Sequence, residues 1–139
     1  MKLKVLFMIC VLVFSLVFAS TLPVFSQEKE QYYWIASVST LPLFLTHDYP
    51  ALKEEADRVG AEIHFMGPQN IDIEMQNNVL QQVMAKNPDG ILFMPFGEGH
   101  NTVIDQVLAQ GVPLVCIDGD APNTNRICYS GTDWEELGR

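Results

Sequence analysis

Short apolar runs alternate with longer amphipathic segments along the chain from about residue 32 onward. Apolar runs of about four to eight residues are typical of buried strands, and apolar side chains three or four positions apart are typical of helices. Their alternation predicts βαβ units, and therefore an α/β fold with a parallel sheet. We expect a doubly wound sheet with strand order 2-1-3-4-5. The expected strands are residues 33–39, 62–66, 90–94, 112–117 and 126–129.

Turn and capping residues mark the helices between these strands. Pro50 stands in the first turn of a helix that stops at Gly60. A second helix covers about residues 72–86 and stops before Pro88, and a third ends at Gly111. Each strand except the last is therefore followed by a turn or helix that carries the chain back, so that the next strand begins at the edge of the sheet where the previous strand began.

A further helix begins near the end of the sequence, where Thr132-Asp133-Trp134-Glu135 fits a capping box that starts at Thr132. Only about seven residues are left for this helix. A helix of that length without a C-cap is marginal. We therefore expect the sequence to be a fragment, with one lobe of a larger protein and the second lobe absent.

Residues 1–26 differ from the rest of the chain. Two lysines precede an almost unbroken apolar run of 14 residues at positions 5–18. A membrane span needs about 17–25 apolar residues, so the run fits a cleaved export signal better than the alternative, a retained anchor. Cleavage sites follow Ala19 and Ser26, and the polar residues after Ser26 favour the later one. We therefore expect a signal peptide at 1–26, a periplasmic or otherwise extracytoplasmic protein, and one lobe at 27–139.

The chain is acidic. Eight Lys and Arg stand against 17 Asp and Glu, for a formal net charge of −9, and removal of the signal with its two lysines lowers this to −11. Nucleic-acid binding requires clustered cations, so we expect no nucleic-acid partner. Cys116 and Cys128 fall in neighbouring expected strands and are either a disulfide or packed free thiols. The cysteines and histidines lack metal-ligand spacing, so we expect no metal and no cofactor.

The carboxyl ends of the strands define where a ligand would bind. With right-handed crossovers all strands point the same way, and ligands collect in the crevice outside these ends. Three loops reach this crevice by prediction, at residues 40–49, 95–100 and 118–125.

Four residues in these loops are candidates for binding a polar small molecule: Thr40, Phe44, Asp118 and Asp120. An aromatic ring beside hydroxyls suits the C–H face of a small polyol, and an ionised Asp accepts hydrogen bonds from two adjacent hydroxyls. Structural alternatives exist for both features. Phe44 would cap the core below the first helix, and Asp118-Gly119-Asp120 would form an Asx-type turn.

The sequence lacks the motifs of enzymes with this architecture. Gly97-Glu98-Gly99 is followed by Thr102 where a dinucleotide fingerprint needs a third glycine, and there is no Gly-Lys-Ser/Thr phosphate loop. No Ser or Cys stands in a nucleophile-elbow context. We therefore expect a binding protein without catalytic residues.

Five segments occur together in an order and spacing that resemble one family. They are Val38-Ser39-Thr40-Leu41, the acidic helix Glu54-Glu55-Ala56-Asp57-Arg58-Val59-Gly60, Asn87-Pro88-Asp89-Gly90-Ile91, Gly111-Val112-Pro113-Leu114-Val115 leading to Asp118, and Gly131-Thr132-Asp133. From about residue 33 to residue 139 the chain is similar to the N-terminal lobe of the type I periplasmic sugar-binding proteins. These are the ribose-binding-like components of ABC importers.

The resemblance implies a two-lobe protein that closes on a monosaccharide or related solute and passes it to a membrane permease. By position, Asp118 matches the hydroxyl-binding Asp of the family, and Phe44 matches one of its stacking aromatics. The chain departs from the ribose-binding pattern, because Phe44-Leu45 replaces two adjacent Phe and Asp118-Gly119 replaces Asp-Arg. These departures leave the solute class open.

Other functions share this lobe. It also serves as the sensing domain of a membrane receptor or as a feeder protein for one, and a transmembrane span and signalling domain beyond residue 139 would indicate that function. A sugar-responsive repressor needs a DNA-binding headpiece, but an export signal occupies that place here. A hydrolase or oxidoreductase on the same architecture is a further alternative, because fold does not fix function.

Overall fold

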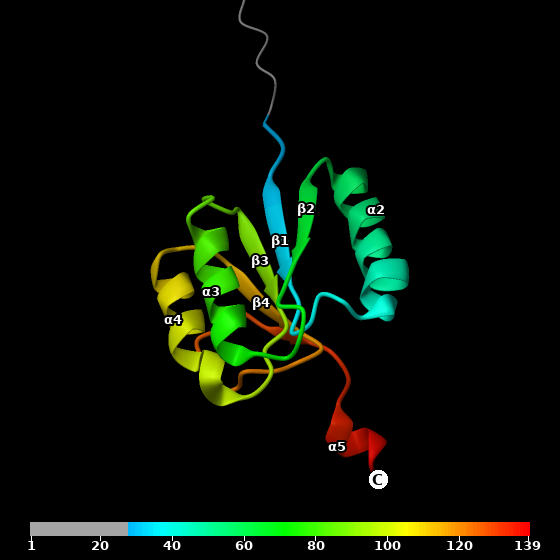
Figure 1. The fold of residues 1–139 in the computed structure, drawn as a ribbon, viewed down its shortest axis with the longest axis vertical. Coiled ribbons are helices and arrows are strands. Elements are labelled where there is room, and N and C mark those ends of the chain that lie inside the picture. The colour runs from blue at the N-terminus through cyan, green and yellow to red at the C-terminus, as the bar shows by residue number, and fades with distance from the viewer. Residues whose placement is uncertain (1–27) are drawn as a thin grey trace, which may run out of the picture.

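The computed structural model describes residues 28–139, which form a five-stranded sheet (Figure 1). The strand order is β2-β1-β3-β4-β5, and every neighbouring pair is parallel. The strands are β1 (Gln31–Ile35), β2 (Glu62–Met66), β3 (Gly90–Phe93), β4 (Leu114–Ile117) and β5 (Tyr129–Ser130). The expected α/β class and strand order are confirmed.

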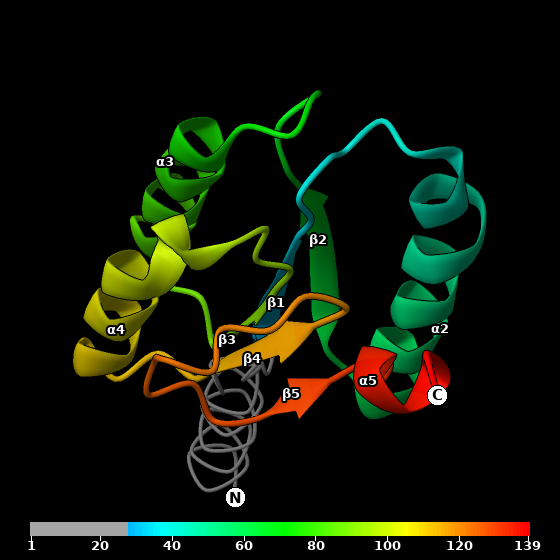
Figure 2. The ribbon, with the colours of Figure 1, turned by 90° about the horizontal axis from the view of Figure 1, so that it is seen from below.

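Helices cover both faces of the sheet. Figure 2 shows α2 (Tyr49–Val59) on one face and both α3 (Ile73–Met84) and α4 (Asn101–Ala109) on the other. The described chain also contains the π-helix η1 (Phe44–Asp48), the 3-10 helix η2 (Glu98–His100) and the short helix α5 (Trp134–Leu137). The sheet is therefore doubly wound, as the hydrophobic pattern predicts.

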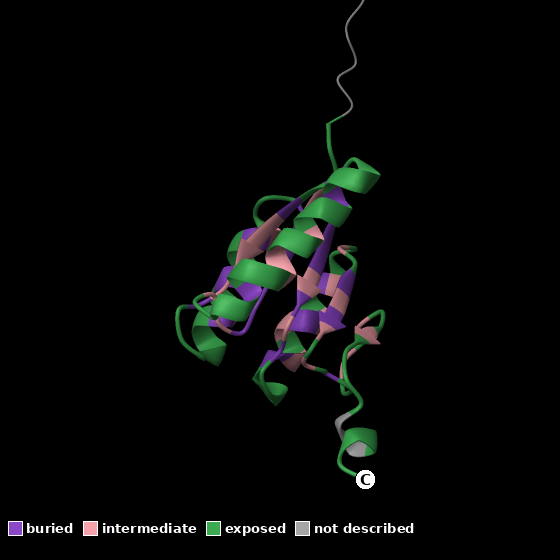
Figure 3. Cartoon of the chain, turned by 90° about the vertical axis from the view of Figure 1, so that its right-hand side faces the viewer, coloured by how far each residue is buried: buried purple, intermediate pink, exposed green. Residues whose placement is uncertain are grey.

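Alternating side chains of β1 contribute to two hydrophobic cores. Tyr33 and Ile35 join the core that α3 and α4 cover, whereas Trp34 joins the core below α2. This division follows from the geometry of a strand, in which successive side chains point to opposite faces. Figure 3 shows the buried residues concentrated in the strands, while the outward side of α2 is exposed. Burial on both faces explains why the central strands read as continuous apolar runs.

Local hydrogen bonds fix the helix ends close to the positions expected from the sequence. Asp72 caps α3, because its Oδ1 accepts a hydrogen bond from the Met75 N–H at 2.9 Å. Gly60 ends α2 in the left-handed conformation, with φ of 79°, and its N–H bonds to the carbonyl oxygens of Ala56 and Asp57. These two residues set the boundaries of their helices through backbone groups that the helix itself leaves unsatisfied.

The first strand and the loop after it differ from the sequence prediction. β1 ends at Ile35 rather than at residue 39. Beyond that point the chain is tied to the segment after β2, where the Ser39 N–H and hydroxyl both donate to the Pro68 oxygen at 2.6 and 2.9 Å. The expected loop at 40–49 is also wrong in part, because Phe44–Asp48 is helical and runs directly into α2.

The last elements are shorter than expected. β4 begins at Leu114 instead of residue 112, since Pro113 has no N–H to donate to a strand ladder. β5 contains only Tyr129–Ser130, so it overlaps the expected strand at 126–129 only at Tyr129. The capping box expected to start at Thr132 is wrong by one residue: the Asp133 Oδ1 accepts the Glu136 N–H at 3.1 Å and caps α5.

Cys116 and Cys128 lie side by side in the structure. The Cys116 N–H donates to the Cys128 carbonyl oxygen at 3.0 Å, yet both thiols are free, with Cys116 buried and Cys128 exposed. Burial is the main cause that raises the pKa of the Cys116 thiol to about 11. A thiol with so high a pKa is unreactive at neutral pH, which fits a packing role.

The predicted signal peptide at residues 1–26 lies outside the described residues. Within residues 28–139, no helix is both long and apolar enough to cross a membrane. Export therefore stays a prediction from the sequence.

Candidate functional site

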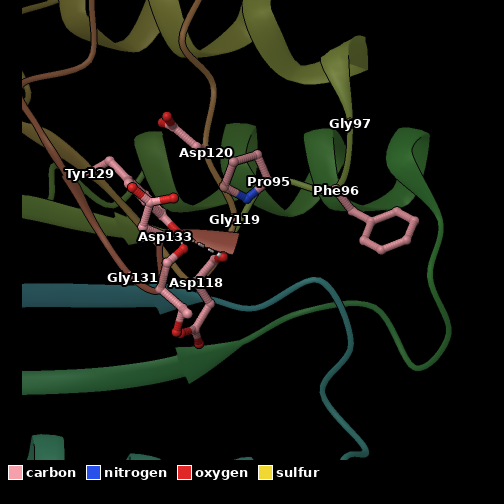
Figure 4. Close-up of a pocket in the computed structure, with 10 residues that line it drawn as sticks. Pro95, Phe96, Gly97, Asp118, Gly119, Asp120, Tyr129, Gly131 and Asp133 are labelled. Carbon is pink, nitrogen blue, oxygen red and sulfur yellow. Dashed lines mark hydrogen bonds between the residues drawn. The ribbon is translucent and has the colours of Figure 1, made fainter. Parts of the chain in front are cut away.

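A cavity of about 620 Å³ lies at the carboxyl ends of β3, β4 and β5 (Figure 4). Its lining residues are Pro95, Phe96, Gly97, Asp118, Gly119, Asp120, Tyr129, Gly131, Thr132 and Asp133. Two of the three loops expected at the crevice, those after β3 and β4, meet here. The third wall comes from the segment around β5, which the sequence analysis did not include.

Asp118 is the first residue after β4 and points its carboxylate into the cavity (Figure 4). Its φ of 59° is left-handed, a conformation that Asp tolerates better than most residues. Two hydrogen bonds hold the turn: the Asp118 N–H donates to the Ser130 backbone oxygen, and the Tyr129 hydroxyl donates to the Asp118 backbone oxygen. Partial burial raises the pKa of the Asp118 carboxyl, and the Asp48 carboxylate raises it further.

Gly119 lets the turn after β4 pass close to the loop after β3. A Cβ atom at this position would lie 2.1 Å from the Pro95 carbonyl oxygen, which is far inside van der Waals contact. The Gly119 N–H donates to the Ile117 oxygen at 2.6 Å, so the turn is tight as well as crowded. In this chain, a side chain at position 119 would therefore require the Pro95 loop to move.

Asp120 also lines the cavity, but both of its carboxylate oxygens already have partners. Arg126 donates to them through Nε at 2.5 Å and Nη2 at 2.9 Å, and the Ala121 N–H donates to Oδ1 at 2.7 Å. The hydrogen bond from Arg126 is the main cause that lowers the pKa of Asp120. In this arrangement Asp120 holds the 118–126 loop in place, and its carboxylate has less hydrogen-bonding capacity left for a ligand than that of Asp118.

Thr40 and Phe44 are not among the residues that line the cavity. The Thr40 hydroxyl donates to the Gln69 oxygen at 2.9 Å. The Phe44 side chain is only 4% exposed and packs edge-on against Trp34, with ring centroids 5.2 Å apart. Phe44 thus occupies the structural alternative that the sequence left open, a cap over the core below α2. The structure brings Asp118 and Asp120 together but not Thr40 and Phe44 with them.

Phe96 is the aromatic residue that the structure places at the cavity and that the sequence analysis did not select. It lies in the loop that follows β3 and is 51% exposed (Figure 4). Its sequence signal was a large aromatic residue between Pro95 and Gly97, in a loop already expected at the crevice. Position in the loop gave no way to distinguish it from Phe44, since an exposed and a buried ring look alike in the sequence.

A polar cluster around the buried His100 holds the loop that carries Phe96. The His100 Nδ1 lies 2.6 Å from the Asn77 Oδ1, and the Asn77 Nδ2 donates to the Gly99 oxygen at 3.1 Å. These two bonds assign the imidazole proton to Nδ1, because the Asn77 Oδ1 is an acceptor. His100 is fully buried, and burial lowers the pKa of its imidazole. α3 therefore supports the β3–α4 loop from below.

Comparison with protein families agrees with this architecture. The family model described as "Periplasmic binding protein domain" matches residues 32–139. The chain belongs to this family. The resemblance drawn from the five sequence segments is confirmed, and the cavity of this periplasmic binding protein domain lies at the edge of the sheet where the resemblance implies a ligand.

The domain is similar to several solved structures. XylFII is 30% identical, with a TM-score of 0.70 over 76% of this chain and 39% of that chain. A sugar-binding protein of a sugar ABC transporter from Bacillus halodurans is 25% identical, with a TM-score of 0.75 over 79% and 38%. AraP, an arabinose binding protein from Geobacillus stearothermophilus, shares the fold at 21% identity and a TM-score of 0.75 over 80% and 38%. The chain spans about two fifths of the length of these structures. A search of curated proteins found no match.

The cavity of the domain combines apolar surface with carboxylates. Pro95 and Phe96 supply apolar surface, and Asp118 and Asp133 supply carboxylates. Among the described residues, no group of three or more His, Cys, Asp or Glu is arranged to hold a metal ion. A ring face beside a carboxylate can hold a small hydroxylated molecule through stacking and hydrogen bonds.

Proposed function

We propose that this domain holds a monosaccharide or related small polar solute without covalent chemistry, as part of the substrate-binding component of an ABC importer. The observation that carries the proposal is that the Asp118 carboxylate and the exposed Phe96 line the same cavity at the strand ends. A polyol presents hydroxyls at its edge and C–H bonds on its face, so it complements both groups. The component works outside the cytoplasm and delivers its solute to a membrane permease.

The relatives support the class of solute. GanP from Geobacillus stearothermophilus, which is 26% identical with a TM-score of 0.64, is a glucose-galactose binding protein. The similar protein from Bacillus halodurans is the sugar-binding protein of a sugar ABC transporter. Neither relative is described as an enzyme, which accords with the absence of catalytic motifs from this sequence.

The four residues selected from the sequence have different roles in the proposed site. Asp118 is the direct contact, and Asp120 shapes the wall beside it through Arg126. Thr40 and Phe44 belong to the proposal as contacts from the β1–α2 side of the crevice. Variants at each position separate these roles.

Calorimetry on the full-length natural protein tests the site, with D-glucose, D-galactose and D-xylose as probes. Asp118→Ala should weaken binding of the preferred sugar by about 1–3 kcal/mol, because sugar hydroxyls lose a charged acceptor in a desolvated cleft. Phe96→Ala should weaken it as well, through lost stacking. Unchanged affinity in both variants, with the fold intact, would place the solute elsewhere.

The remaining two positions need milder substitutions. Phe44→Ala would remove a buried ring and cost about 3–5 kcal/mol of stability, so Phe44→Leu is the better test. Thr40→Val keeps the shape and removes only the hydroxyl that bonds to Gln69. Loss of sugar affinity in either variant, at unchanged melting behaviour, would establish a contact that the cavity itself does not show.

A second function is favoured by one comparison. XylFII, at 30% identity, has also been solved in a complex with LytSN. A feeder protein that docks on a receptor domain is therefore the alternative to import. Purification of the full-length protein with its neighbouring gene products separates the two functions, because import requires a permease partner and sensing requires a receptor partner.

A further inference from the structure

His100 closes the base of the loop that follows β3. The loop leaves the strand after Phe93 and reaches α4 at His100, and it supplies Pro95, Phe96 and Gly97 to the cavity lining. The His100 imidazole packs edge-on against the Phe93 ring, with centroids 5.2 Å apart, so the two ends of the loop meet at this contact. Both side chains are fully buried. The position of this cavity wall therefore depends on the His100 ring.

The hydrogen bonds of His100 suit a neutral imidazole. Its Nδ1–H donates to the Asn77 Oδ1 at 2.6 Å, and the Asn77 amide is oriented by its second bond, to the Gly99 oxygen. The Nε2 atom is buried and has no hydrogen-bond partner among the described residues. A second proton would have to lie on Nε2, and a buried N–H without an acceptor is costly.

The charged groups around the ring do not offset this cost. Those on the elements packed against it are Asp72 and Glu74 at the start of α3, Glu98 of η2 and Asp105 of α4. Glu74 and Glu98 are exposed, while Asp72 and Asp105 each accept a backbone N–H. His100 also stands at the N-terminus of α4, where the helix dipole is positive. Burial is accordingly the cause that lowers the pKa of the imidazole.

We propose that His100 is a positioning residue for the cavity wall, and that a proton on its imidazole opens the 94–99 loop and weakens solute binding. This inference rests on the proposed function, because it names the regulation of the same cavity. A protonated Nε2 reaches water only if the ring leaves its contacts with Phe93 and Asn77, and the base of the loop then separates. The lining residues that the loop carries move with it.

The two states of the loop set the direction of the pH dependence. In the closed loop the pKa of His100 lies below its ordinary value of 6.5, and in an open loop the solvated ring returns to that value. Solute affinity is therefore complete above about pH 6.5 and falls as the pH drops below it. At pH 5 a ring of ordinary pKa favours its protonated form by about 30-fold, which limits the loss of affinity to about that factor.

Calorimetry on the full-length natural protein at pH 7 and pH 5 tests the proposal, with D-glucose, D-galactose and D-xylose as probes. Affinity for a sugar that binds should fall at least about threefold at pH 5 in the wild type, and less in His100→Gln, which cannot take up the proton. His64→Gln is the matched control, because His64 lies in β2 and outside the cavity lining, and it should keep the wild-type loss. Carboxyl groups, Asp118 included, titrate in all three proteins and cancel.

A charged partner for the imidazole gives a second test. Asn77→Asp places a carboxylate beside Nδ1, so the closed loop tolerates the imidazolium and the loss of affinity at pH 5 should shrink. A purely structural role of this hydrogen bond predicts no such change. The variant retains His100, so it tests the proposal even if His100→Gln does not fold.

Hydrogen exchange at residues 94–100 follows the loop without any sugar. Relative to the intrinsic exchange rate at each pH, exchange should increase from pH 7 to pH 5 in the wild type and less in both variants. An equal increase in all three proteins, or an equal loss of affinity, overturns the role of His100 and leaves sugar binding standing. Failure of every sugar to bind refutes the proposed function, and the exchange data then decide by themselves whether His100 controls the loop.

Discussion

Two adjacent residues, Asp118 and Gly119, make the wall of the cavity through opposite properties. Asp118 contributes a carboxylate on a left-handed backbone, whereas Gly119 contributes only the absence of a side chain. The sequence indicated the aspartate because a carboxylate directly after a buried strand can accept hydrogen bonds from a ligand. The glycine was not distinguishable from any turn glycine until its contact with Pro95 was visible.

Gly119→Ala should destabilise the protein by about 3 kcal/mol or more, because the new methyl group would meet the Pro95 oxygen, a backbone atom that cannot rotate away. Gly111→Ala is the matched control. Gly111 has a φ of 85°, and a Cβ added there would have no neighbouring atom within 4 Å, so alanine should cost only about 1 kcal/mol of backbone strain. Urea denaturation of both variants measures the difference, and equal losses would contradict the crowding at Gly119.

At the scale of elements, α3 supports the loop that carries Phe96. Its Gln76 Nε2 donates to the Met94 oxygen at 2.8 Å, and its Asn77 bonds to His100 and to Gly99. These contacts join a helix to a loop about 20 residues later in the chain, as their sequence separations of 18 to 23 show. The position of the Phe96 ring thus depends on a helix that contributes no lining residue to the cavity.

The buried His100 should make stability fall with decreasing pH. Burial lowers the pKa of the His100 imidazole in the folded state below the ordinary value of 6.5. The imidazole therefore binds a proton more weakly in the folded protein than in the unfolded chain. The neutral form therefore stabilises the fold fully above about pH 6.5, and this stability is lost progressively as the pH drops below that value. Urea denaturation at pH 7 and pH 5 should show a larger loss in the wild type than in His100→Gln.

The His100→Gln variant keeps a side chain that can donate to Asn77, so it isolates the titration from the packing. Acidic residues that titrate at lower pH affect both proteins alike and cancel in the comparison. The same pH dependence in both proteins would show that His100 takes no part in it.

At the scale of the whole molecule, the sequence predicts that the hydrophobic N-terminal segment is removed from the acidic remainder on export. We expect cleavage near Ser26, because the basic start, the apolar run and the small residues occur in the order of an export signal. Intact-mass measurement of the exported protein should give the chain that begins at Gln27. A mature protein that begins at Ser20 would favour the earlier site, and a full-length soluble form in the cytoplasm would contradict export.

The sequence by itself determined the α/β class, the strand order and the family. β2 was predicted at residues 62–66 and occurs as Glu62–Met66, and the second helix was predicted within two residues of its observed ends. These features are local, because hydrophobic periodicity, caps and turn residues act over a few neighbouring positions. The end of β1 was missed because it depends on pairing with the segment around Pro68, not on the apolar pattern of β1 itself.

Only the tertiary structure decided which loop residues face the cavity. Phe44 and Phe96 are both aromatic residues after a strand, but Trp34 and the α2 core enclose Phe44 while Phe96 is left exposed. Asp118 and Asp120 are two residues apart, but only Asp120 meets Arg126. The direction of a side chain and the residues that it contacts depend on parts of the chain distant in the sequence. Local patterns therefore determine the fold, whereas long-range packing determines the chemistry of the site.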